Sequence, residues 1–244
     1  VNYFFSHLLI FILCYVFNKD TYLCYSMNIA AKGQSNQIAE LEQLLNKYTI
    51  IPFKINEIES YDVIFDLDFD DTPEQIQYYM ELEGKLIIVG AVKVQLEEIL
   101  AEIGELANCP IIGMNTLPTF LNRSLLELCA LNEDDKSIAS AILSSLDLEY
   151  RFVASRVGLV TPRIICMIIN EAYFTLQEGT ASREDIDLGM KLGTAYPKGP
   201  FEWSKEIGLE HVYETLEALY QDTKDERYKI CPLLKTEYLK GFTS

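Results

Sequence analysis

The sequence predicts an α/β fold followed by an all-helical segment. Between residues 27 and 154, short apolar runs alternate with stretches of helical spacing, which is typical of a mostly parallel sheet covered by helices on both faces. From residue 155 to residue 244 the apolar residues recur only at helical spacing. The chain has 244 residues, 49% of them hydrophobic, which is enough for two such domains. We therefore expect a boundary near residue 154.

Seven short apolar runs are predicted to be the strands of the sheet. Each has the length and the apolar character of a buried strand. They span residues 27–31, 48–53, 62–67, 85–89, 110–114, 125–131 and 149–153.

Helices are predicted between these strands and after them. Residues 72–75 read Thr-Pro-Glu-Gln, an N-cap, a proline at the first helical position and a capping-box glutamine, so a helix should continue to about Leu82. In the second domain, Pro200 is suited to the first turn of a helix. The other predicted helices span residues 34–45, 96–106, 137–146, 163–176, 182–193, 209–220 and 233–239.

The first 26 residues differ from the rest, because residues 3–17 are almost unbroken apolar sequence. This run is shorter than the roughly 17–25 residues of a spanning helix. It also lacks the preceding basic residue and the following Ala-x-Ala site of a signal peptide. We favour translation from Met27, with residues 1–26 outside the protein, over a membrane anchor.

Charge and cysteine usage restrict the partners and the compartment. The net charge of −17, from 37 acidic and 20 basic residues, disfavours a nucleic-acid partner. No two of the six cysteines have the spacing of a metal knuckle, and several lie in apolar runs. We expect reduced core cysteines in a cytoplasmic protein without a metal site. The two histidines are His7 and His211.

One segment of the helical half carries a specific pattern. Residues 178–187 read Glu-Gly-Thr-Ala-Ser-Arg-Glu-Asp-Ile-Asp, and residues 189–202 read Gly-Met-Lys-Leu-Gly-Thr-Ala-Tyr-Pro-Lys-Gly-Pro-Phe-Glu. This sequence closely resembles the C-terminal domain of 3-hydroxyacyl-CoA dehydrogenases. A weaker resemblance extends over nearly all of residues 27–239.

The resemblance implies an NAD-binding Rossmann domain, a helical domain that mediates dimerisation, and an active site in the cleft between them. From the residues of this chain we expect the Rossmann-like sheet domain to be shortened, and the dimer to be a homodimer. The implied reaction is hydride transfer between a 3-hydroxyacyl-CoA and NAD. In the family, a histidine held by a glutamate takes the hydroxyl proton, and serine and asparagine side chains orient the substrate oxygen.

The phosphate loop departs from the family pattern. Where the family has Gly-x-Gly-x-x-Gly, this chain has Ala30, Lys32 and Ser35. A lysine in the middle position should obstruct the pyrophosphate, although Lys32 could instead contact a phosphate, with Gly33 beside it. No acid follows the second strand at the ribose position, and the stretch before Asp62 is short. A β-α-β segment is therefore predicted to be missing.

The acid–base pair also departs from the pattern. Asn115 stands where the family has its catalytic histidine, and Glu127 follows at the spacing of the partner glutamate. An amide cannot take up the proton. Glu127 could act alone as the base if burial raised its pKa. We favour the alternative that Glu127 is a remnant, hydrogen-bonded to Asn115 as a structural pair.

The substrate-orienting positions have lost their side chains. Residues 89–93 read Val-Gly-Ala-Val-Lys, without a hydroxyl or an amide. The family's Asn-Arg pair appears as Pro162 followed by Arg163.

Three functions follow. The preferred one is a family member with lost or altered catalysis, which binds an acyl-CoA or serves as a scaffolding dimer and needs no cofactor. The second is an active NAD-dependent 3-hydroxyacyl-CoA dehydrogenase with a non-standard site. The third is a structural dimer without a small-molecule ligand.

Overall fold

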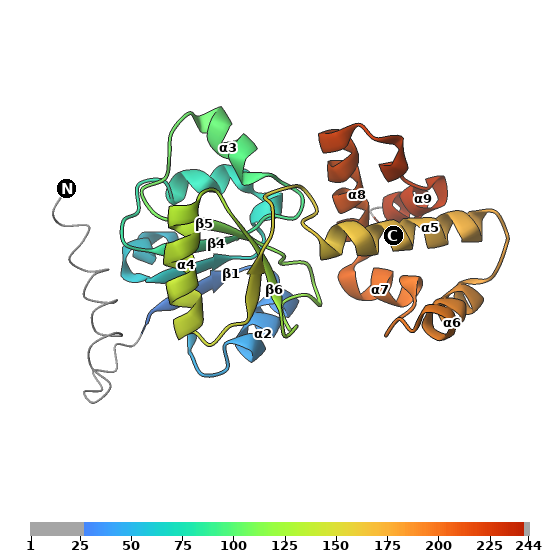
Figure 1. Ribbon diagram of the computed structural model, residues 1–244, viewed down its shortest axis with the longest axis horizontal. Coiled ribbons are helices and arrows are strands. Elements are labelled where there is room, and N and C mark those ends of the chain that lie inside the picture. Colours follow the sequence, from blue (N-terminus) through green and yellow to red (C-terminus); the bar gives the residue numbers. More distant parts are fainter. Residues whose placement is uncertain (1–26, 242–244) are drawn as a thin grey trace.

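The computed structural model describes residues 27–241, so the apolar run 3–17 lies outside the described residues. Figure 1 shows two parts, a sheet flanked by helices and a group of helices joined to it by one crossing of the chain. The sheet ends with Phe152 and the first helix of the second part begins at Thr161. The α/β and all-α composition predicted from the sequence is confirmed.

The sheet has seven strands in the order β2-β1-β3-β4-β5-β6-β7. Neighbouring strands are parallel except β5 and β6, which are antiparallel. The mostly parallel arrangement agrees with the prediction. The strands are β1 (Ile29–Lys32), β2 (Ile50–Pro52), β3 (Val63–Asp66), β4 (Leu86–Gly90), β5 (Ile111–Met114), β6 (Leu126–Ala130) and β7 (Tyr150–Phe152).

The edge of the sheet beyond β1 is short. In the usual doubly wound order, two strands lie on that side of the first strand, whereas here β2 is the only one in the described sheet. The sheet is therefore one strand shorter on this side, in agreement with the shortened sheet domain that was predicted.

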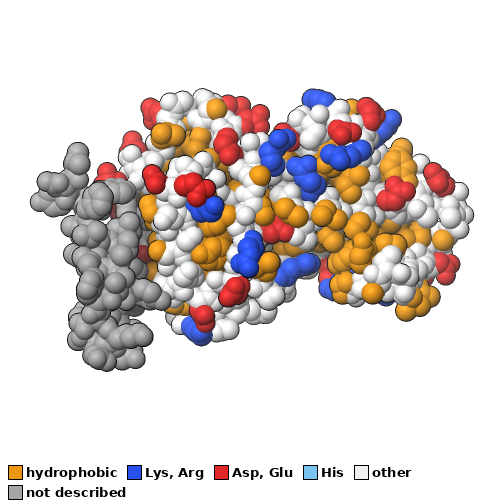
Figure 2. All heavy atoms as spheres, viewed as in Figure 1, with side chains coloured by type: hydrophobic (Ala, Val, Ile, Leu, Met, Phe, Trp, Pro, Cys, Tyr) orange, Lys and Arg blue, Asp and Glu red, His pale blue; other side chains and the backbone are white. Residues whose placement is uncertain are grey.

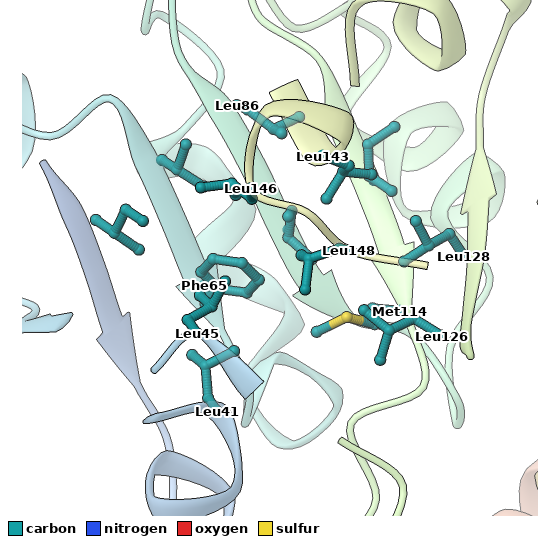
Figure 3. Packing of buried hydrophobic residues seen from close by; sticks show 14 of the residues in the cluster. Leu41, Leu45, Phe65, Leu86, Met114, Leu126, Leu128, Leu143, Leu146 and Leu148 are labelled. Atoms are coloured by element: carbon teal, nitrogen blue, oxygen red, sulfur yellow. The ribbon is translucent and has the colours of Figure 1, made fainter. Parts of the chain in front are cut away.

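Helices cover both faces of the sheet. One face packs against α2 (Ser35–Leu44) and α4 (Glu133–Ser145). Figure 3 shows this core, in which leucines of both helices meet Phe65, Met114 and Leu128 of the strands. The other face is covered by α3 (Leu96–Ile103) and by the 3-10 helices η1 (Ile55–Ser60), η2 (Phe69–Asp71) and η3 (Pro73–Tyr78).

Two predicted helices differ from the structure. The helix expected over residues 72–82 is the 3-10 helix η3 followed by turns. The 3-10 helix ends at Tyr78, and the turns that follow it bury Tyr79, Met80 and Leu82. Helix α4 begins at Glu133, before the expected residue 137, because the Asn132 side chain accepts a hydrogen bond from the backbone of Asp135 (2.8 Å).

The second part consists of helices packed around α5. They are α5 (Thr161–Gln177), α6 (Arg183–Thr194), α7 (Pro200–Ile207), α8 (Leu209–Thr223), the 3-10 helix η4 (Glu226–Tyr228) and α9 (Pro232–Gly241). Their core also contains Val92, Leu117, Phe120 and Cys129 of the α/β part. The two parts thus share one apolar cluster. Among residues 27–241, no helix has the length and apolar character needed to cross a membrane.

Candidate functional site

The candidate residues converge on one edge of the sheet. Strands β1, β3, β4 and β5 are parallel, so their carboxyl ends lie together. Strand β6 runs the opposite way, and its first residues therefore start at that same edge. Lys32, Asn115 and Glu127 are accordingly placed at the side of an open sheet where ligands usually bind.

The Lys32 ammonium is held by acidic side chains. Its Nζ lies 3.2 Å from Oδ1 of Asp66 and 3.2 Å from Oδ1 of Asp68, and it donates a hydrogen bond to Gln75. Burial raises the pKa of Asp66 to about 6, against the lowering effects of its hydrogen bond from Tyr79 and of the Lys32 charge. Two carboxylates surround the single cation, so Lys32 offers little net positive charge to a phosphate.

The turn at Gly33 has no spare room. Gly33 has a φ of +154°, and a Cβ on it would lie 2.8 Å from Cβ of Leu67. The buried side chain of Gln37 fills the adjoining space. It donates hydrogen bonds to the backbone oxygens of Leu67 (3.1 Å) and Thr116 (2.8 Å), and it accepts one from the N–H of Gln34 (2.9 Å). The chain's own atoms therefore occupy the turn between β1 and α2.

These residues do not fit a pyrophosphate. A dinucleotide needs unobstructed backbone N–H groups at the start of this helix and a positive or neutral surrounding. Here the N–H of Gln34 is already taken by Gln37, and Asp66 and Asp68 outweigh the charge of Lys32. Sequence reasoning missed Gln37, although its position three residues after Gln34 is the spacing of a capping box.

Asn115 is shut away from solvent. Only 4% of the residue is exposed, and its Oδ1 accepts a hydrogen bond from the N–H of Leu117 (3.3 Å). The backbone N–H of Asn115 donates to the backbone oxygen of Glu127 (3.1 Å). The two residues are thus joined through the main chain, as neighbours across β5 and β6. The position where the family has its base is buried and carries an amide.

The Glu127 carboxylate is directed to the start of α5. It accepts hydrogen bonds from the backbone N–H of Val160 (3.1 Å) and of Thr161 (3.0 Å), and another from the Thr161 hydroxyl. A carboxylate at the N-terminus of a helix is stabilised by the unpaired N–H groups and the helix dipole. Glu127 therefore ties β6 to α5.

The substrate-orienting segment is packed as well. A Cβ on Gly90 would lie 2.5 Å from Oγ1 of Thr116. The carboxylate of Asp70 accepts hydrogen bonds from the N–H groups of Val92 (3.0 Å) and Lys93 (2.7 Å). The segment 89–93 is thereby fixed against its neighbours and leaves no side chain free to orient a substrate.

His211 is buried in the helical part, and Arg163 is hydrogen-bonded to groups of this chain. His211 lies on α8 and is 6% exposed. Burial, and then the charge of Lys93, lower its pKa. Arg163 donates to the hydroxyl of Tyr228 (2.8 Å) and to the backbone oxygen of Val157 (2.5 Å), and it lies over the Tyr228 ring. The retained arginine thus holds η4 against α5.

Two surface hollows lie away from the carboxyl edge of the sheet. One, of about 260 Å³, is lined by residues of α8, η4 and α9 and of the segment between η4 and α9. The other, of about 310 Å³, is lined by residues around the ends of β6 and β7 and the start of α4. The part of the chain that the structure describes contains no group of three side chains suited to a metal ion. Its four cysteines are free and buried, as expected.

Sequence comparison places the similarity mainly in the helical part. Residues 158–243 match the family described as the C-terminal domain of 3-hydroxyacyl-CoA dehydrogenase. The 3-hydroxyadipyl-CoA dehydrogenase of Escherichia coli K12 is 41% identical over 87 residues, 36% of this chain and 18% of that protein. A probable 3-hydroxybutyryl-CoA dehydrogenase of Bacillus subtilis is 31% identical over 147 residues, 58% of this chain and 51% of that protein. The chain thus matches about half or less of the length of these relatives.

Solved structures extend the likeness to the whole fold. FadB2 of M. tuberculosis has a TM-score of 0.72 and 15% identity, and the match covers 88% of this chain and 94% of that one. A (S)-3-hydroxybutyryl-CoA dehydrogenase of Ralstonia eutropha has a TM-score of 0.68 and 22% identity, with the same coverage. These likenesses concern the fold. Residues 158–243 thus carry the C-terminal domain of the 3-hydroxyacyl-CoA dehydrogenase family, and for the rest of the chain the likeness is one of fold.

Proposed function

We propose that this chain is a non-catalytic member of its family, which retains the scaffold for association through the helical part. The observation that carries this proposal is the position of Glu127. Its carboxylate is bound to the first turn of α5, and its neighbour Asn115 is a buried amide. The pair that would move the proton in the family is here part of the framework.

Each requirement of hydride transfer lacks its residue. Proton removal needs a titratable base within reach of the substrate, and Asn115 is neither titratable nor exposed. The cofactor needs a free phosphate-binding turn, and Gln37 and Lys32 are engaged there with this chain's own groups. The alternative, an NAD-dependent dehydrogenase with a non-standard site, would require both regions to rearrange.

The surface of the helical part supports a homodimer. Ile164 on α5 and Leu188 and Leu192 on α6 are 55%, 51% and 78% exposed. Figure 2 shows hydrophobic side chains gathered along α5 and toward α6 on the face turned to the viewer. Exposed apolar side chains on the helices of one part are typical of a protein–protein contact. We place the protein in the cytoplasm because the four described cysteines are unpaired.

Turnover decides between the proposed function and the alternative. Protein is mixed with NADH and acetoacetyl-CoA, and absorbance at the reduced-nicotinamide band is followed. We expect no oxidation above the buffer rate. Turnover that disappears in Glu127→Gln would overturn the proposal and support an active dehydrogenase.

Ligand binding and association are measured separately. We expect titration calorimetry to show no heat with NADH. With acetoacetyl-CoA, heat would indicate that the protein still holds an acyl-CoA, and its absence would leave association as the retained role. We expect sedimentation velocity to show a dimer at micromolar concentration, and a monomer at every concentration would contradict the scaffolding role.

A further inference from the structure

A lysine at the carboxyl edge of the sheet joins the two parts of the molecule. Lys93 follows β4, and its Nζ donates hydrogen bonds to Asp71 of η2 (2.7 Å) and to Glu214 of α8 (2.6 Å). The Lys93 side chain is 9% exposed. We propose that Lys93 is an electrostatic latch, which holds the helical part against the sheet and keeps the cleft between them closed.

The backbone that carries the latch is fixed on two sides. The carboxylate of Asp70 accepts the N–H groups of Val92 and Lys93, and the backbone oxygen of Val92 accepts the N–H of Gly158 (2.6 Å). Gly158 belongs to the segment that leads into α5. Lys93 therefore reaches Glu214 from a rigid backbone, so pairing costs the rotamer freedom of the side chains but no further backbone entropy.

The charges around Lys93 keep it ionised. Burial lowers the pKa of Lys93. The hydrogen bonds to Asp71 and Glu214 and the charge of Asp70 together raise it by more, so the pKa lies above its usual range. Asp71 holds the ammonium from the α/β side and Glu214 from the helical side. Removing Glu214 would leave a nearly buried cation with one fewer partner, a costly arrangement.

An apolar contact between the sheet and the helical part lies next to Lys93. Val92, the preceding residue, is fully buried in the apolar cluster of the helical part. The ion pair thus lies beside an apolar contact between the same two parts. The inference stands whether or not the chain has lost catalysis, because it concerns how the two parts are held.

Trypsin cleavage after Arg156 tests the latch, because this residue lies in the segment between β7 and α5. Arg156 itself is exposed, but Val157 after the scissile bond is 4% exposed and Gly158 is hydrogen-bonded to Val92. Cleavage therefore requires opening of the two parts to release this segment, so its rate reports the open population. We expect Glu214→Gln to raise the rate about tenfold, which corresponds to about 1.4 kcal/mol. Lys93→Met should do the same, and the double variant should be no faster than either single variant.

Lys47→Met is the matched control. Lys47 pairs with Asp147 at 2.6 Å, but both side chains are largely exposed and both lie in the α/β part. Its cleavage rate should equal that of the unchanged protein. If Lys93→Met does not fold, as judged by circular dichroism, the isosteric Glu214→Gln decides alone. An unchanged rate in Glu214→Gln, or single effects that multiply in the double variant, would overturn the latch.

Discussion

Glu127 and Thr161, 34 positions apart in the sequence, are joined by two hydrogen bonds. The carboxylate accepts one from the Thr161 N–H (3.0 Å) and one from the Thr161 hydroxyl. The residue before the helix, Val160, has no side-chain group that could cap α5. Glu127 therefore supplies from another strand the cap that the local sequence lacks. The carboxylate for which the resemblance implied a role beside a histidine is here part of a helix terminus.

Replacement of Glu127 by alanine should destabilise the fold. The substitution leaves the N–H groups of Val160 and Thr161 without their acceptor, which costs about 1–3 kcal/mol. Urea unfolding measures this as a lower midpoint. Glu171→Ala, on the exposed face of the same helix, should change the free energy of unfolding by less than about 0.5 kcal/mol. Equal stabilities of the two variants would show that the cap contributes nothing.

Replacement of Gln37 by alanine should also be costly. It leaves the backbone oxygens of Leu67 and Thr116 without this buried donor, and we expect a loss of about 2 kcal/mol. Gln43→Ala is the control, because Gln43 lies on the same helix and is exposed. We expect neither variant to bind NADH in a fluorescence titration, since Lys32, Asp66 and Asp68 remain. NADH binding by Gln37→Ala would show that this side chain alone closes the turn.

His211 should make the protein less stable in mild acid. Its pKa in the folded state is lowered by burial and by Lys93, whereas Glu210, Asp71 and Glu214 act in the opposite direction. The unfolded chain thus takes up the proton first. The stability that comes from neutral His211 is complete above pH 6.5 and is lost as the pH falls below that value.

Urea midpoints at pH 7.5 and pH 5.5 check this sign. The urea midpoint of the unchanged protein should fall more between pH 7.5 and pH 5.5 than the midpoint of His211→Gln does. Acidic residues that titrate in the same range are common to both proteins and cancel in the comparison. An identical pH response would mean that His211 is not shifted.

Asp70 should titrate far above an ordinary aspartate. Burial raises its pKa to about 6, although the N–H groups of Val92 and Lys93 lower it. A raised pKa means that this group favours the folded state at low pH and that the contribution is lost as the pH rises through about 6. Carbon NMR of the carboxyl group gives the midpoint directly. Asp147, whose pKa is lowered by Lys47, is the internal reference, and a midpoint of Asp70 near 3.8 would contradict the prediction.

The apolar surface of α5 and α6 should hold the dimer. Leu192→Glu and Ile164→Glu place charges on side chains that are 78% and 55% exposed in the single chain, so they should not unfold it. We expect either variant to weaken association at least tenfold in sedimentation equilibrium, because a buried unpaired charge is costly. Leu239→Glu, on the exposed part of α9, should leave the dimer intact. Dimers of unchanged affinity in all three would locate the contact elsewhere.

Much of the fold could be predicted from local patterns. The seven strands are short apolar runs bounded by turn residues. Both features are local in the sequence, so the strands can be recognised without knowledge of the fold. The shortened sheet edge followed from the few residues before Asp62. The 3-10 helix η3 could not be predicted in the same way, because Thr-Pro-Glu-Gln also begins α-helices.

The candidate site was predictable only as a set of positions. The absence of a histidine at residue 115 and the presence of Lys32 in the loop are visible in the sequence. The partners of Glu127 and of Gln37 are not, since they lie 34 and 79 positions away. Such contacts depend on how strands and helices come together in space, and no local propensity records them.

The position of β2 explains how the sequence of the α/β part could change more than the sequence of the helical part. Strand β2 is at one margin of the sheet, and β6 and β7, which lead to the helices, are at the opposite margin. A segment can therefore be deleted beside β2 while β1 and β3 still separate the change from β4 and from Val92, which packs in the helical core. Residues 158–243 can thus keep their match to the family domain while the margin at β2 changes.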